Sequence, residues 1–182
     1  MNLPNLITLA RIAAVPFTIW LIVEGHLMGA FWLFVAAGVS DALDGFIAKR
    51  FNMETELGKY LDPLADKALL VSVYIALGLE GHVVNWLVIL VVFRDVFIIG
   101  GALLFETMTH SLTMQPLMIS KINTTVQIVF AASVMAAAGY GVKLDGVMDM
   151  LVLATAGTTI ASGVAYAIEW IKRWAQLEED QR

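Results

Sequence analysis

The sequence predicts an all-α, polytopic membrane protein with six transmembrane helices. Of its 182 residues, 59% are hydrophobic, whereas ordinary globular chains are roughly 45–50% apolar. The mean hydropathy of the chain is +0.80. Six stretches also approach the roughly 20 consecutive apolar residues that a helix needs to cross a bilayer. Together, these observations argue against a soluble domain.

The six predicted helices follow one another with little intervening sequence. They lie near residues 4–24, 29–50, 58–79, 84–106, 119–140 and 147–172. The connections after the first, third and fifth helices are short and contain glycine, which favours tight turns between antiparallel neighbours. The connections at 51–57 and 107–118 are longer and more polar. Because no internal repeat or second domain is visible, we expect residues 1–182 to form one membrane domain.

The distribution of basic residues predicts the orientation of these helices. Six spans place both termini on the same side of the membrane. The basic residues at or near that side are Lys49, Arg50, Lys59, Lys67, Lys121, Lys172, Arg173 and Arg182, whereas Lys143 lies on the other side. Since cytoplasmic loops carry the excess of Lys and Arg, we expect both termini to be cytoplasmic. Trp170 and Trp174 then fall near an interface, where aromatic side chains gather.

The remaining composition excludes several classes of protein and site. The formal net charge of −5 provides no basic footprint for nucleic acid. The chain has no cysteine, which excludes disulfides and thiolate metal sites. Its first residues lack the basic region of a signal peptide and the Arg/Ser richness of a transit peptide, so we expect Met1 to be the mature start.

Four aspartates between residues 41 and 66 are the main candidates for a functional site. Asp41 and Asp44 are three residues apart, and Asp62 and Asp66 are four apart, so each pair shares one face of a helix. Small residues lie on the same faces at helical spacing: Gly45, Ala48 and Gly58. A merely solvated acidic face would show scattered spacing and no such small residues. We therefore interpret the two pairs as a ligand site that a substrate approaches closely.

Oxygen-ligand chemistry indicates what these carboxylates bind. Converging carboxylates repel one another, which raises the pKa of some of them unless cations are present. All-oxygen ligation favours Mg²⁺ or Mn²⁺, which commonly combine a few carboxylates with substrate phosphates. Four acids suit two metal ions, and two-metal sites stabilise the attacking and leaving oxygens of a phosphoryl displacement. Basic residues beside the aspartates could neutralise phosphate oxygens; they are Lys49, Arg50, Lys59 and Lys67.

The same stretch resembles the motif of the CDP-alcohol phosphatidyltransferase family, D-x2-D-G-x2-A-R-x8-G-x3-D-x3-D. Seven of the eight fixed positions match. The departure is at the position of the family's Arg, which is Lys49 here and is followed by Arg50. Either the ammonium of Lys49, a point charge, therefore replaces the guanidinium of Arg, which can bind two oxygens at once, or Arg50 makes the contact of the family's Arg. The six-helix prediction extends the resemblance over the whole chain.

The resemblance implies a reaction in which an acceptor hydroxyl attacks the β-phosphorus of a CDP-activated lipid and releases CMP. It also implies roles for individual residues. Asp41, Asp44, Asp62 and Asp66 would hold the two metal ions, and Asp66 would also be the general base. The implied CDP-lipid contacts are Gly45, Ala48, Lys49, Arg50 and Gly58, with Asn5 and Thr8 from the first helix. Close packing of helices is expected at Gly100, Gly101, Gly157 and Gly163, and the resemblance implies a homodimer through such membrane surfaces.

The acceptor depends on residues outside this motif. Arg94, Lys121 and Arg11 are the candidate acceptor contacts. Family members that use glycerol 3-phosphate usually carry a second Arg eight residues after the one resembled by Arg94, and that position is Ala102 here. A phosphomonoester carries close to two charges and prefers several cations. A site with fewer cations suits a phosphodiester acceptor.

Further segments resemble the cardiolipin synthases of this family: NLPNLITLARI, LDPLADK, RDVFI and SKINTTVQ. We therefore expect CDP-diacylglycerol as the donor and phosphatidylglycerol as the acceptor. Phosphatidylglycerophosphate synthase, which uses glycerol 3-phosphate, is the close alternative. We expect the enzyme in a bacterial inner membrane with its active site facing the cytoplasm, or in the mitochondrial inner membrane of a eukaryote.

Some candidate residues also have a simpler interpretation. Arg94 and Asp95 could form an intramembrane ion pair between helices. Lys121 could be a positive-inside anchor. The polar residues of the first helix, Asn5, Thr8 and Arg11, could hydrogen-bond to other helices. A different class of protein, an ion-coupled transporter, would also place carboxylates in membrane helices, but it would show inverted repeats or broken helices, and neither is visible.

Overall fold

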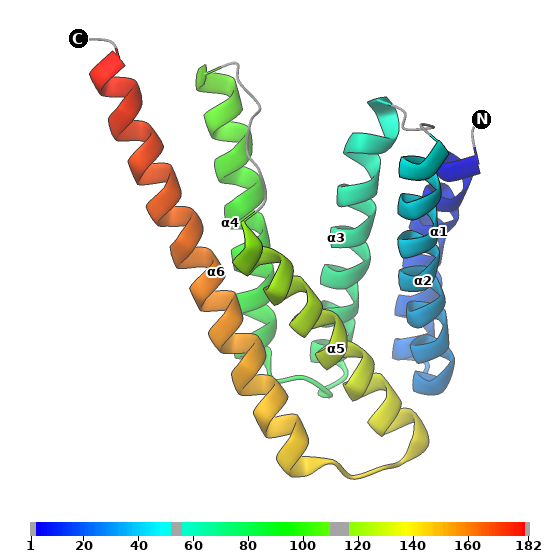
Figure 1. Cartoon of the computed structure of the whole chain (residues 1–182). Coiled ribbons are helices and arrows are strands. Elements are labelled where there is room, and N and C mark those ends of the chain that lie inside the picture. Colours follow the sequence, from blue (N-terminus) through cyan, green and yellow to red (C-terminus); the bar gives the residue numbers. More distant parts are fainter. Residues whose placement is uncertain (1–2, 52–55, 110–116, 181–182) are drawn as a thin grey trace. The chain divides into compact units, whose positions relative to one another are not determined.

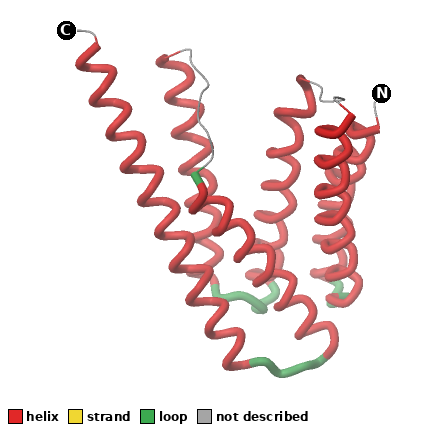
Figure 2. The backbone as a smooth tube through the Cα atoms, viewed as in Figure 1, coloured by secondary structure: helices red, strands yellow, loops and turns green. Residues whose placement is uncertain are grey.

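The computed structural model describes the backbone of residues 3–51, 56–109 and 117–180, and the side chains of residues 9–40, 67–105, 107, 117–144 and 146–175. The described backbone contains six α-helices and no strand (Figures 1 and 2). The helices are α1 (Leu3–Val23), α2 (Leu27–Phe51), α3 (Glu56–Leu79), α4 (Asn85–Thr109), α5 (Met118–Tyr140) and α6 (Asp145–Asp180). Their bounds lie within a few residues of the prediction, except that α6 continues to Asp180. The all-α class is confirmed.

Glycines in left-handed conformation end α1, α3 and α5. Gly25 has a φ of 74°, and Gly81 and Gly141 share this conformation with φ of 76° and 68°. At the end of α1, the amide of His26 donates to the carbonyl of Leu21 over 2.7 Å and the amide of Gly25 donates to that of Ile22 over 3.0 Å. These bonds satisfy carbonyls that a helix end leaves open. The short glycine-containing turns of the sequence are therefore helix caps.

The chain divides into two compact units, of which the first comprises Met1–Asn85 and Ala131–Asp145. In this unit α1 packs against both α2 and α3. Its buried side chains include Ile22, Phe34 and Val73. The last turn of α5 approaches the start of α2 closely, because a Cβ at Gly139 would lie 2.7 Å from the backbone nitrogen of Met28.

The second unit comprises Trp86–Phe130 and Gly146–Arg182, which is most of α4, the first half of α5 and most of α6. Large apolar side chains of α4, such as Ile89, Phe93 and Val96, are exposed. Polar side chains are instead buried where the helices meet, among them Asn123 and Thr159. This inside-out arrangement suits lipid, because contiguous exposed apolar surface is unfavourable in water.

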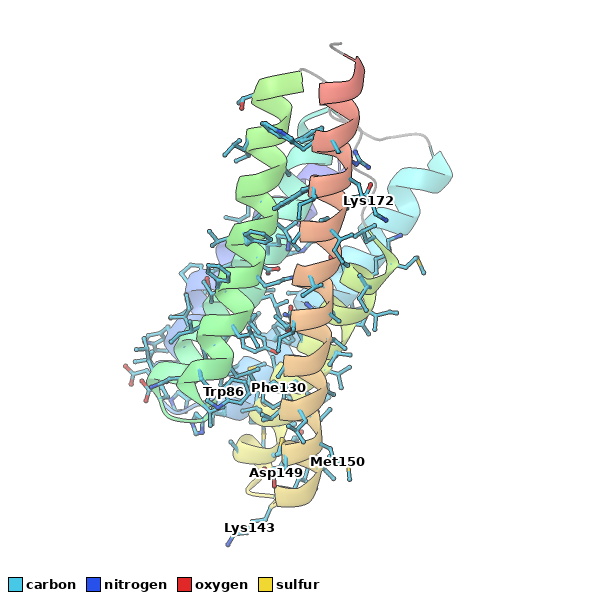
Figure 3. The ribbon with its side chains drawn as sticks, turned by 90° about the vertical axis from the view of Figure 1, so that its left-hand side faces the viewer. Trp86, Phe130, Lys143, Asp149, Met150 and Lys172 are labelled. Atoms are coloured by element: carbon cyan, nitrogen blue, oxygen red, sulfur yellow. The ribbon has the colours of Figure 1, made fainter. Side chains whose placement is uncertain are left out.

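Among the residues whose side chains are described, three helices are long and apolar enough to cross a membrane: Asn85–Phe105 in α4, Met118–Tyr140 in α5 and Gly146–Ala175 in α6. Shorter apolar stretches, within the residues whose side chains are described, occur in α1, α2 and α3 at Leu9–Val23, Leu27–Ser40 and Lys67–Leu79. Figure 3 shows Lys172 toward the opposite end of α6 from Asp149 and Met150. The helices thus support a membrane protein, while six spans and the side of the termini stay predictions.

Candidate functional site

The predicted metal ligands lie on two helices of the first unit. Asp41 and Asp44 are in the C-terminal part of α2, and Asp62 and Asp66 are in the N-terminal part of α3. Both pairs are therefore helical, as their spacing predicted. Figure 1 shows the C-terminal end of α2 and the N-terminal ends of α1 and α3 at the same end of this unit. The side chains of the four aspartates lie outside the described residues.

The predicted CDP-lipid contacts are on the same three helices. Gly45, Ala48, Lys49 and Arg50 belong to α2, Gly58 belongs to α3, and Asn5 and Thr8 belong to α1. Their side-chain surroundings also lie outside the described residues, so their roles stay predictions. Arg11, one turn further along α1, has a described side chain and is buried.

The donor chemistry of the two aspartate pairs fits a hard divalent cation. No group of three or more His, Cys, Asp or Glu residues that could hold a metal ion occurs among the residues whose side chains are described. The aspartates of α2 and α3 stay the predicted ligands, because carboxylate oxygens are the ligands that Mg²⁺ and Mn²⁺ prefer. With Mg²⁺ or Mn²⁺ bound, such a site would neutralise phosphate oxygens.

Arg94 of α4 is the best-defined charged residue of the second unit. Its side chain is almost completely buried, as is that of Asp95. The Nη1 of Arg94 lies 2.5 Å from Oδ1 of Asp95, which confirms an ion pair, although it forms within α4 instead of between helices. A charge at membrane depth needs such a partner. The charges of the two side chains balance each other.

Two serines from neighbouring helices complete the surroundings of Arg94. The Nη2 of Arg94 donates to Oγ of Ser120 in α5 over 2.6 Å. Both Nε and Nη2 donate to Oγ of Ser162 in α6, and the Nε bond is 3.2 Å long. Neither serine was predicted as a partner of Arg94, because a serine in an apolar helix carries no signal of the face it occupies.

A neutral polar network continues from this point between α5 and α6. The hydroxyls of Thr158 and Thr159 both donate to Oδ1 of Asn123, over 2.9 and 3.0 Å. One turn further along α5, Nε2 of Gln127 donates to Oγ1 of Thr159 over 3.3 Å. Interhelical bonds of this kind hold membrane helices together. The network explains why α5 and α6 contain buried polar residues in apolar surroundings.

Lys121 follows Ser120 on α5, and its side chain is exposed. Just before α5, the amide of Leu117 lies 3.4 Å from the hydroxyl of Tyr166 in α6. This contact places the start of α5 beside the same part of α6 that carries Ser162. Lys121 is therefore a cation near the level of Arg94, available either to an anionic ligand or to lipid headgroups.

Between α4 and α6 lies an apolar groove of about 430 Å³. Its lining includes Phe97, Gly100, Leu104, Trp170 and Trp174. The six-membered ring of Trp170 covers Gly101, where a Cβ would overlap it. The lining is almost wholly carbon, so this groove can accept hydrocarbon but contributes no reacting group.

Comparison with known proteins identifies the family of the chain. The family model of the CDP-alcohol phosphatidyltransferases matches residues 1–174. The chain is 35% identical to a rice chloroplastic CDP-diacylglycerol–glycerol-3-phosphate 3-phosphatidyltransferase over 93% of its own length and 57% of the relative. It is 33% identical to the rat CMP-forming cardiolipin synthase over 91% of its own length and 60% of the relative.

The chain thus spans somewhat more than half the length of these two relatives. A relative of similar size is the CDP-diacylglycerol–glycerol-3-phosphate 3-phosphatidyltransferase of Rickettsia bellii, which is 34% identical over 91% of this chain and 93% of the relative. Relatives of both acceptor types therefore match to about the same degree. Because the family model covers nearly the whole sequence, the chain belongs to the CDP-alcohol phosphatidyltransferase family.

Proposed function

We propose that this protein is a phospholipid synthase that transfers a phosphatidyl group from CDP-diacylglycerol to phosphatidylglycerol, giving cardiolipin and CMP. The family match and the enzyme names of the relatives support the transfer reaction. The names of the relatives do not select the acceptor, since they include both cardiolipin synthases and enzymes named for glycerol 3-phosphate. The choice of acceptor therefore depends on the residues of this chain.

The reaction assigns a task to each part of the aspartate site. Asp41, Asp44, Asp62 and Asp66 would hold two Mg²⁺ or Mn²⁺ ions, which neutralise the charge on the pyrophosphate when bound. Asp66 would accept the proton of the acceptor hydroxyl. The hydroxyl oxygen forms a bond to the β-phosphorus, and the bond between that phosphorus and the oxygen bridging to the α-phosphorus breaks, so that CMP leaves. Lys49 or Arg50 would bind the pyrophosphate oxygens.

The state of Arg94 is the observation that favours phosphatidylglycerol. Its charge is balanced by Asp95, and its N–H groups are largely directed to Asp95, Ser120 and Ser162. The sequence has no other Lys or Arg between Arg94 and Lys121. A dianionic phosphomonoester prefers several free cations, whereas a phosphodiester with one charge needs fewer. We therefore propose a phosphodiester as the acceptor that Arg94 and Lys121 contact, and Arg11 stays a contact predicted from the sequence alone.

One incubation tests the proposal. Purified protein receives labelled CDP-diacylglycerol, Mg²⁺ or Mn²⁺, and either phosphatidylglycerol or glycerol 3-phosphate. We expect labelled cardiolipin with the first acceptor, no product with the second, and no reaction in excess EDTA until Mg²⁺ or Mn²⁺ is restored. Phosphatidylglycerophosphate as the product would instead establish the alternative that the rice and Rickettsia relatives suggest.

Failure to release CMP with either acceptor, together with cation flux in liposomes, would favour the transporter hypothesis. The same preparation tests assembly, because the proposed homodimer predicts twice the mass of the chain in detergent. We place the enzyme in a bacterial inner membrane, or the mitochondrial equivalent, with the aspartates on the cytoplasmic side.

A further inference from the structure

The guanidinium of Arg94 is arranged in a way that bears on which anions it can bind. An arginine has five N–H donors, and the edge formed by Nε and Nη2 is one that can bind two oxygens of a phosphate or carboxylate. In this protein both nitrogens of that edge donate to a single oxygen, Oγ of Ser162. The second N–H of Nη2 donates to Ser120, and one N–H of Nη1 donates to Asp95.

We infer that Ser162 is a specificity-determining residue whose hydroxyl closes the bidentate edge of Arg94. Four of the five donors of Arg94 are engaged by Asp95, Ser120 and Ser162, which leaves one N–H on Nη1. A single N–H suits one oxygen of a phosphodiester and is a poor match for a phosphomonoester. This inference rests on the proposed function, because it takes Arg94 as a contact of the acceptor.

The local packing protects the hydrogen bonds between Ser162 and Arg94. The side chains of Arg94, Asp95 and Ser162 are all buried, so water does not compete for these bonds. The backbone of α6 also comes close to the arginine, since a Cβ at Gly163 would lie 3.9 Å from Cγ of Arg94. A dianionic acceptor would have to displace Ser162 and approach the carboxylate of Asp95. Both requirements act against glycerol 3-phosphate.

The test removes the hydroxyl and measures binding as well as turnover. Ser162→Ala frees Nε and Nη2 of Arg94. We expect this variant to bind labelled glycerol 3-phosphate about tenfold more tightly than the parent, since one buried hydrogen bond to a charged group changes an affinity by about that factor. Phosphatidylglycerophosphate, which the parent should not form, should become a detectable product of Ser162→Ala. Ser162→Thr, which keeps the hydroxyl, should behave as the parent.

Two further variants separate this effect from a loss of structure. Thr155→Val removes another buried hydroxyl of α6, which has no hydrogen-bond partner among the described residues, and should leave acceptor preference unchanged. Ser162→Cys keeps nearly the same size but is a weak acceptor, so it should shift preference in the same direction if Ser162→Ala fails to fold. Midpoints of unfolding in detergent show which variants are folded.

The outcomes distinguish this inference from the proposed function. Unchanged binding of glycerol 3-phosphate by folded Ser162→Ala and Ser162→Cys overturns the inference, and so does an equal gain in Ser162→Thr or Thr155→Val. A parent enzyme that makes phosphatidylglycerophosphate overturns the proposed acceptor. In that case the binding ratio between Ser162→Ala and the parent still decides whether Ser162 closes the edge.

Discussion

At the scale of single residues, the buried ion pair of α4 shows what a sequence can reveal about a charge in a membrane helix. Arg94 and Asp95 were recognisable as partners, because isolated charges are costly at membrane depth. Ser120 and Ser162, which bond to Arg94, were not recognisable. Whether a serine faces lipid or another helix depends on the rotation of its helix, which tertiary packing sets.

The aspartates lead to a prediction at the same scale. Asp66→Asn should lower turnover by about 10²–10⁴-fold, since it removes the proposed general base. It should retain more affinity for CMP than Asp41→Asn, because Asp41 is proposed solely as a metal ligand. Turnover of CDP-diacylglycerol and equilibrium binding of labelled CMP measure the two effects. Equal loss of CMP binding in the two variants would contradict the assignment of the base to Asp66.

At the scale of elements, the glycines of α4 turn out to have different roles. Gly100 and Gly101 were predicted to let helices pack closely, with a homodimer implied through such surfaces. Gly101 is covered by Trp170 of α6 within the same chain, whereas a Cβ at Gly100 would meet open space. Sequence could place the small residues on the helix but could not say which helix covers each of them.

This difference gives a matched pair of variants. Gly101→Ala should lower the free energy of unfolding by about 1–3 kcal/mol, because the indole must move to admit the new methyl group. Gly100→Ala should be neutral or slightly stabilising, since it only reduces backbone freedom. Truncating the indole in Gly101→Ala/Trp170→Leu should recover part of the loss. Unfolding in detergent reports all three, and a Gly101→Ala protein as stable as Gly100→Ala would refute the contact.

Gly139 provides a stricter test of helix packing in the first unit. A Cβ there would lie 2.7 Å from the backbone nitrogen of Met28 and 2.9 Å from its Cα. Backbone atoms cannot rotate away, so Gly139→Ala should destabilise the protein by at least about 1–3 kcal/mol, and truncation in Gly139→Ala/Met28→Ala should not restore it. Gly157→Ala, where space is open, is the control. Full recovery by Met28→Ala would show that a side chain, not the backbone, makes the contact.

At the scale of the whole molecule, the helices were predictable because their signals are local. Apolar runs and the capping glycines Gly25, Gly81 and Gly141 fix each helix within the chain. The hydrogen bonds between α5 and α6 were not predictable in this way. The bond between Thr158 and Asn123, for example, joins residues 35 positions apart, and no local sequence pattern indicates it. The candidate metal site is predictable only in part. Helical spacing pairs the aspartates within α2 and within α3, but it does not give the distance between the two pairs.

Membrane orientation is the remaining large-scale prediction, and the absence of cysteine makes it directly testable. Six spans with cytoplasmic termini place the turns after α1, α3 and α5 outside and the end of α6 inside. Single variants His26→Cys, His82→Cys and Lys143→Cys should react with a membrane-impermeant maleimide in intact cells, whereas Lys172→Cys should react only in inside-out vesicles. All four side chains are exposed, so a lack of reaction reflects the membrane and not burial. Labelling of Lys143→Cys and Lys172→Cys from the same side would mean that α6 does not cross the bilayer. Labelling of His26→Cys from the cytoplasm would mean that α1 does not cross it either, and the basis for placing the aspartates at the cytoplasmic face would then be lost.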